Sequence, residues 1–123
     1  PLTSVAKHLG VVRAAKRAFP DLILVGSGYS YLAEYLPHVA QHELGKGHVD
    51  FVGLGRMLLA YPELPQHVLR GVELERSRIC RTISDCTTAP RHGIVSGCFP
   101  LDPHYRSLPE AEELHAIKQG GER

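Results

Sequence analysis

Two apolar segments, each followed at once by a pair of glycines, constrain the fold of this 123-residue chain most strongly. Residues 22–25 lead into Gly26-Ser27-Gly28, and residues 49–52 lead into Gly53-Leu54-Gly55. Short apolar runs of this kind are typical of strands that are buried on both faces, as in parallel sheets. Helical patterns precede, separate and follow the two runs. The order therefore predicts an α/β fold in which helices connect parallel strands.

Hydrophobic spacing predicts the helices around these strands. Val5, Leu9 and Val12 recur at helical spacing. Pro20 ends this helix, because the residue before a proline leaves the α region. Residues 82–104 show neither helical nor strand periodicity, so we expect an ordered but irregular extension there. The predicted helices span residues 4–18, 29–43, 57–60, 63–70 and 109–118.

Two strands do not form a stable sheet by themselves, because they leave apolar faces and unpaired edges exposed. We therefore expect further strands to lie outside this chain or to come from another chain. The chain also begins with Pro1 and enters a predicted helix within a few residues. Together these features predict that the sequence is a fragment of a longer protein.

Composition excludes several classes of protein. Hydrophobic residues make up 43% of the chain and charged residues 22%, as in a globular domain. A net charge of +1 argues against a nucleic-acid-binding protein, and no apolar run approaches the roughly 18 residues that a membrane span needs. An odd number of cysteines, three, favours free thiols or metal ligands in a reducing compartment. We predict a cytoplasmic protein without nucleic-acid or membrane partners.

The two glycine turns together predict a phosphate site. Glycine lets backbone N–H groups approach a ligand closely, and the carboxyl ends of neighbouring parallel strands lie side by side. The amides of Ser27, Gly28, Gly55 and Arg56 would then converge on one anion. The Arg56 guanidinium and the positive end of the following helix would add to its binding. The alternative is that Gly53 and Gly55 only form a tight turn, with Arg56 in solvent. Phosphate sites built from two such loops recur in (β/α)₈ barrels.

These segments resemble a known family. The step from Val25 into Gly26-Ser27-Gly28, together with VDFVGLGRMLLAYPELP at residues 49–65, resembles the end of the barrel in the old yellow enzyme family. Its members are FMN-dependent NADH:flavin oxidoreductases and ene-reductases. CRTISDCTTAPR, at residues 80–91, is similar to the extension of 2,4-dienoyl-CoA reductase-like members.

The resemblance implies a fold and two regions. The fold would be the C-terminal part of a (β/α)₈ TIM barrel, its last two βα units, followed by an irregular extension and a final helix. Residues 1–71 would form the C-terminal portion of the FMN-binding barrel. Residues 72–123 would form the extension, with a cysteine-containing loop and the terminal helix.

The resemblance also implies roles for named residues. Gly55 and Arg56 match the residues that bind the FMN phosphate, and Gly26, Ser27 and Gly28 match the loop that supplies further amides. The flavin-ring and catalytic residues of the family belong to earlier strands, so no catalytic residue is assigned in this chain. The family transfers hydride from NAD(P)H through the flavin to a small-molecule acceptor such as an activated alkene.

By this reading the chain is a fragment of an FMN-dependent oxidoreductase. It would supply the FMN phosphate-binding loops and would be inactive alone. A homo-oligomeric parent protein is compatible with this interpretation. Two alternatives remain open at this point. One is a phosphate-ligand-binding or self-associating α/β module without redox chemistry, and the other is a different phosphate-binding TIM-barrel enzyme.

The cysteines depart from the pattern of the resembling family. Its iron–sulfur members bind a four-iron cluster through C-x₂-C-x₃-C-x₁₁-C. Here Cys86 and Cys98 keep the eleven-residue gap, but Ile83 stands at the second position and the gap from Cys80 to Cys86 is one residue short. Because such a cluster needs four ligands, we expect neither an iron–sulfur cluster nor another metal, and interpret the cysteines as small buried thiols. A zinc site that includes His92 or His104 is a weaker alternative.

Other side chains receive no functional assignment. We expect the histidines on predicted helices, including His8, to be surface residues. Tyr29 directly follows the first glycine loop. It either borders the phosphate or packs at the start of its helix.

Overall fold

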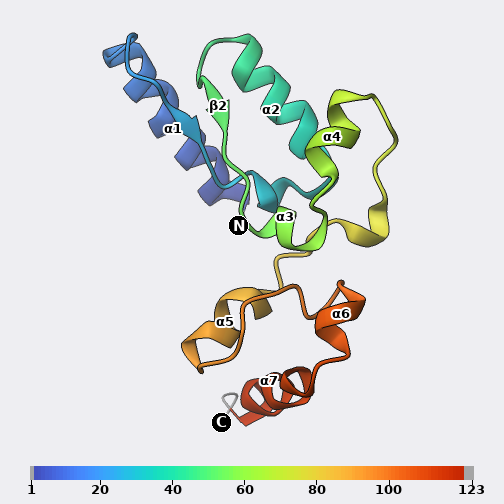
Figure 1. Cartoon of the computed structure of the whole chain (residues 1–123). Coiled ribbons are helices and arrows are strands. Elements are labelled where there is room, and N and C mark those ends of the chain that lie inside the picture. The colour runs from blue at the N-terminus through green and yellow to red at the C-terminus, as the bar shows by residue number, and fades with distance from the viewer. Residues whose placement is uncertain (1, 121–123) are drawn as a thin grey trace.

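The computed structural model describes residues 2–120 as two groups of helices, with one short strand pair in the first group (Figure 1). Strand β1 is Val25–Gly26 and strand β2 is Phe51–Val52. The helices, with the 3-10 helices marked η, are α1 (Leu2–Ala18), η1 (Tyr29–Tyr35), α2 (Leu36–Gly45), α3 (Arg56–Ala60), α4 (Leu64–Leu69), η2 (Arg76–Arg78), α5 (Asp85–Arg91), α6 (Pro103–Arg106) and α7 (Pro109–Gly120).

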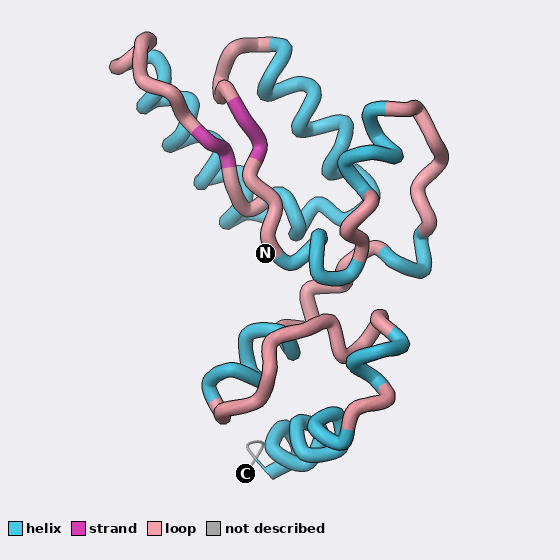
Figure 2. Tube along the Cα trace, viewed as in Figure 1, coloured by secondary structure: helices cyan, strands magenta, loops and turns pink. Residues whose placement is uncertain are grey.

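The two strands are parallel neighbours, as the sequence predicts (Figure 2). Val25 pairs with Phe51, and Gly26 pairs with Val52. The Gly53 amide donates to the Gly26 carbonyl over 2.7 Å, so the pairing continues into the turns that follow. The carboxyl ends of β1 and β2 therefore lie side by side.

The predicted C-terminal part of a (β/α)₈ TIM barrel, its last two βα units, is wrong. About 60% of the described residues are helical, and each strand contains only two residues. At the amino end of the pair, the Asp50 carboxylate accepts the Leu24 amide over 2.7 Å and also binds Lys16. The Asp50 side chain thus accepts a backbone amide that would donate to a carbonyl of the neighbouring strand in a longer ladder. The fold is mostly helical, with a minimal parallel strand pair.

The helix predicted over residues 29–43 is broken. Ala33 has φ 49° and ψ −122°, a non-helical conformation inside the 3-10 helix η1, and the α-helix α2 begins only at Leu36. In a continuous helix the amide of residue 37 would donate to the Ala33 carbonyl. Residue 37 is a proline, which lacks that N–H and whose ring would clash with the same carbonyl. Pro37 therefore explains the break.

The region predicted to be irregular, residues 82–104, contains helix α5 and the start of helix α6. Two threonines and a proline give α5 a low intrinsic helix propensity. Its Ala89 is completely buried, in one cluster with Phe99 and Leu114. Tertiary packing of an apolar face thus stabilises a helix that propensity does not predict.

Two clusters of buried side chains hold the described chain together. The N-terminal core includes Leu9, Tyr29 and Met57, and the segment after α4 adds Ile79 and Cys80 to it. The C-terminal core is smaller and is centred on Ala89, Ile94, Phe99 and Leu114. Figure 1 shows α1 to α4 in one group of helices and α5 to α7 in the other.

The strand pair presents an apolar face to solvent. The cross-strand partners Val25 and Phe51 are 59% and 60% exposed. Ile23, just before β1, is 70% exposed, and Phe19 is also exposed. Contiguous exposed apolar side chains of this kind mark surfaces that another protein segment covers.

Candidate functional site: the glycine turns and their pocket

The turn after β1 needs its glycines, whereas the turn after β2 has open space beside Gly55. Gly28 has φ 84°, a left-handed conformation that side chains rarely adopt. A Cβ at Gly26 would lie 2.7 Å from the Tyr29 hydroxyl oxygen. A Cβ at Gly55 would meet no atom within 4 Å, so the second turn borders open space. The glycines thus shape the first turn and leave room beside the second.

An open pocket of about 420 Å³ lies beside the first turn. We call it the turn pocket; it is lined by Ser4, Val5, His8, Ser27, Gly28 and Tyr31. His8 Nε2 and Ser27 Oγ lie 3.1 Å apart, so helix α1 contributes a polar group to this turn. Of the predicted site residues, Ser27 and Gly28 line the turn pocket.

Arg56, at the first position of α3, is held beside the turn pocket. Its Nη2 donates to the Tyr31 hydroxyl over 2.8 Å, and its Cζ lies 4.8 Å from the centre of the Tyr31 ring. Its Nη1 donates to Ser84 Oγ over 3.3 Å. A guanidinium has five N–H donors, and these two bonds use two of them. Arg56 thus connects η1, at the turn pocket, to the segment that leads into the C-terminal core.

The helix after the second turn adds little positive potential. Helix α3 has only five residues, so its dipole is small. Its Met57 amide donates to Ser30 Oγ over 3.3 Å and is already satisfied. Attraction for an anion therefore depends on the Arg56 guanidinium, the Ser27 hydroxyl and the amides of the turns.

Tyr29 packs inside the N-terminal core and does not border the turn pocket. Its side chain is fully buried, with its hydroxyl beneath Gly26. Burial raises the pKa of Tyr29, and the nearby Glu43 carboxylate raises this pKa further. Tyr29 therefore supports the first glycine turn by packing, which is the second of the two roles expected from the sequence.

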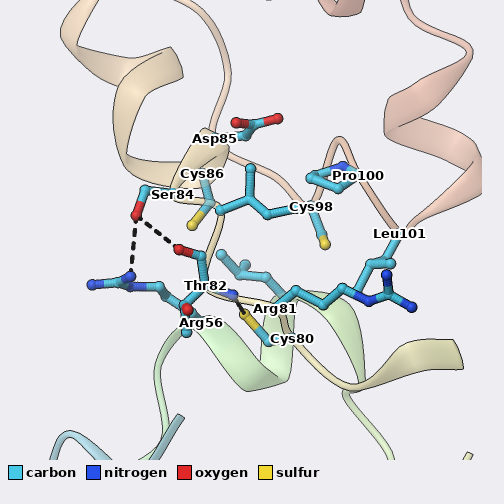
Figure 3. A pocket seen from close by; sticks show the side chains of 12 residues that line it. Arg56, Cys80, Arg81, Thr82, Ser84, Asp85, Cys86, Cys98, Pro100 and Leu101 are labelled. Atoms are coloured by element: carbon cyan, nitrogen blue, oxygen red, sulfur yellow. Dashed lines mark hydrogen bonds between the residues drawn. The ribbon is translucent and has the colours of Figure 1, made fainter. Parts of the chain in front are cut away.

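All three cysteines line a second, smaller pocket together with Arg56 (Figure 3). We call this the thiol pocket; its space of about 20 Å³ is that of roughly one water molecule. Burial raises the pKa values of the Cys86 and Cys98 thiols, and Arg56 partly opposes this at Cys86. Neutral buried thiols are poor nucleophiles and poor metal ligands, because both roles need the thiolate.

The thiol pocket does not fit a four-thiolate cluster. Ile83 lines it where the resembling family has a cysteine. Within residues 2–120, the one group of three metal-ligand atoms within 4.8 Å of each other is His42, Glu43 and His48. Both Glu43 oxygens already accept from Arg13. We derive no metal chemistry from either place.

Comparison with protein-family models, curated proteins and solved structures finds no match for this chain. No helix within residues 2–120 is long and apolar enough to cross a membrane.

Sequence reasoning placed the two turns together but missed three of their neighbours. His8 reaches Ser27 across 19 positions, and Ser84 reaches Arg56 across 28. Tyr31, which lines the turn pocket, has no local signal beyond its place beside an apolar stripe. The polar character of His8 and its position near the start of α1 were the only available indications.

Proposed function

We propose that this chain supplies the FMN phosphate-binding loops of an FMN-dependent NAD(P)H oxidoreductase of the ene-reductase or NADH:flavin oxidoreductase type. The observation that carries the proposal is the juxtaposition of the two glycine turns, with Ser27 on the first and Arg56 on the second. It supports an anion site in which both turns contribute. The proposal rests on these turns and on the sequence resemblance.

The donor set around the turns fits a phosphate group. Ser27 offers a hydroxyl, Gly28 an amide without an obstructing side chain, and Arg56 a guanidinium that binds phosphate oxygens in pairs. Open space beside Gly55 gives a ligand access to the second turn. When bound, FMN would accept and pass on hydride, and this chain would bind and orient its phosphate. The acceptor would be a small molecule such as an activated alkene.

Titration of the purified chain with FMN, followed by flavin fluorescence, tests the proposal. Circular dichroism on the same samples establishes that each variant is folded. We expect Arg56→Ala to weaken binding about 10- to 100-fold, because hydrogen bonds to charged groups contribute roughly 1.5–3 kcal/mol. Arg70→Ala is the matched control, since Arg70 is an exposed arginine that lines neither pocket. A folded wild-type chain that does not bind FMN would refute the proposal.

A self-associating module is the second candidate, and the apolar face of the strand pair favours it. Ile23, Val25 and Phe51 are each more than half exposed. A second copy that covers this face would bury them and complete the sheet edge. Sedimentation equilibrium should then show a dimer that Ile23→Lys converts to a monomer. A monomeric wild-type chain at all concentrations would exclude this candidate.

A further inference from the structure

We propose that His8 forms a third side of the phosphate site and makes it select a flavin with a terminal phosphate monoester. The inference rests on the proposed function, since it concerns the same ligand. It adds a residue from helix α1 that belongs to neither glycine turn.

His8 is placed against the first turn by the packing of α1. Val5 and Leu9, which precede and follow it on the helix, are both buried in the N-terminal core. This anchoring directs the intervening His8 ring toward the turn, where Nε2 lies 3.1 Å from Ser27 Oγ. The ring also limits the space over Gly28, because a Cβ there would lie 3.8 Å from His8 Cδ2. The imidazole thus stands where a group bound by Ser27 and Gly28 would meet it.

The residues that face His8 are compatible with an anion. Ser4 and Tyr31, which line the same pocket, carry hydroxyl groups, and Lys7 precedes His8 on α1. Arg56 binds the Tyr31 hydroxyl from the second turn. Neither aspartate nor glutamate lines the turn pocket among the described residues. A ring nitrogen of His8 can therefore donate to a phosphate oxygen without competition from a neighbouring carboxylate.

The three-sided arrangement matches a terminal phosphate. A phosphate monoester presents three oxygens and about 1.5 to 2 negative charges near pH 7. The first turn and His8 line the turn pocket and offer donors to it, and Arg56, which does not line this pocket, brings its positive charge beside it through the bond to the Tyr31 hydroxyl. Riboflavin has only a hydroxyl at this position and would gain little from these donors. The chemical class selected is therefore a flavin that ends in a phosphate monoester.

The test compares FMN and riboflavin titrations of the full chain in wild type, His8→Ala and His8→Gln. His38→Ala serves as control, because His38 is an exposed histidine on α2 that lines neither the turn pocket nor the thiol pocket. We expect His8→Ala to weaken FMN binding about tenfold and to leave riboflavin binding unchanged, so that discrimination between the two falls tenfold. His8→Gln should restore part of the loss, because its amide can still donate. Inorganic phosphate should compete with FMN less well in His8→Ala than in wild type.

The outcomes separate this inference from the proposed function. If Arg56→Ala loses FMN binding and folded His8→Ala does not, His8 has no part in the site and the inference alone fails. Equal losses for FMN and riboflavin would assign His8 a packing role and overturn it. If wild type is folded and binds no FMN, both proposals fail. If His8→Ala does not fold, His8→Gln takes its place in the test. A ratio of FMN affinity to riboflavin affinity equal to that of wild type would then overturn the inference.

Discussion

The N-terminal and C-terminal cores differ in what holds them together and in what they support. The N-terminal core combines large buried side chains with an ion pair in which the Glu43 carboxylate is only 1% exposed. It positions both glycine turns and the turn pocket. The C-terminal core is smaller, and its Asp85–Lys118 ion pair lies nearer the surface. The candidate site is supported mainly by the N-terminal core, to which the C-terminal region adds Cys98 and the Ser84 bond to Arg56, so damage to the C-terminal core should affect the site less.

The largest effect is expected where α1 joins α2. Replacing Arg13 by methionine leaves the buried Glu43 carboxylate without its main partner. Breaking such a pair is strongly destabilising, and we expect Arg13→Met to lower the free energy of unfolding by about 3 kcal/mol. Urea unfolding measures this change, with Arg17→Met on the same helix as control. FMN affinity should also fall, because α1 carries His8. A change in unfolding free energy like that of the control would show that the pair does not support this core.

The same pair makes a prediction about pH. The hydrogen bond from Arg13 lowers the pKa of Glu43 below its usual value, and the charges of Arg13 and His48 act in the same direction. A carboxyl with a lowered folded-state pKa contributes stability above its unfolded pKa of about 4.3, and this contribution is lost as the pH falls through the folded pKa. The difference between wild type and Arg13→Met should therefore be full at pH 7 and shrink below about pH 4.3. A difference that grows on acidification would contradict this assignment.

The next effect should appear mainly in the C-terminal core. A Cβ at Gly97 would lie 2.1 Å from the Tyr105 ring, which packs against Phe99. Overpacking of this kind costs about 2 kcal/mol, so Gly97→Ala should speed hydrogen exchange in α5 and α7. Exchange in α1 and α2, and FMN affinity, should stay as in wild type. Gly10→Ala is the control, because a Cβ at that helical position meets no atom within 4 Å. Equal loosening of both cores would show that they unfold as one unit.

The smallest effect concerns the junction of the two cores. Arg56 lowers the pKa of Cys86 against the larger, opposite effect of burial. Arg56→Ala should therefore raise this pKa further and slow the alkylation of Cys86 by iodoacetamide a few-fold at pH 8, because only the thiolate reacts. Peptide mass spectrometry follows Cys86 separately from the other thiols, and Arg70→Ala is the control. Faster alkylation in Arg56→Ala would mean that Arg56 shields the thiol rather than activating it.

Features governed by short-range rules could be predicted from the sequence. The position of α1, the parallel strand pair and the adjacent glycine turns all follow from periodicity and glycine placement. The strand lengths could not be predicted in this way, because the Asp50 carboxylate accepts the Leu24 amide that would donate to the backbone in a longer strand ladder. Helix α5 could not be predicted either, because it depends on the burial of Ala89 in the C-terminal core. The barrel was inferred from the resemblance of the two strand-and-turn segments to a barrel family, and those segments do not report how long each strand is.

The places where the backbone turns follow from local sequence. Gly28 permits a left-handed conformation, and Pro37 cannot continue a helix, whatever surrounds them. Which side chains meet at these turns depends on tertiary packing. His8 lies beside Ser27 because α1 buries Val5 and Leu9 in the N-terminal core. Such contacts depend on how whole elements dock, and no rule that acts over a few neighbouring residues contains that information.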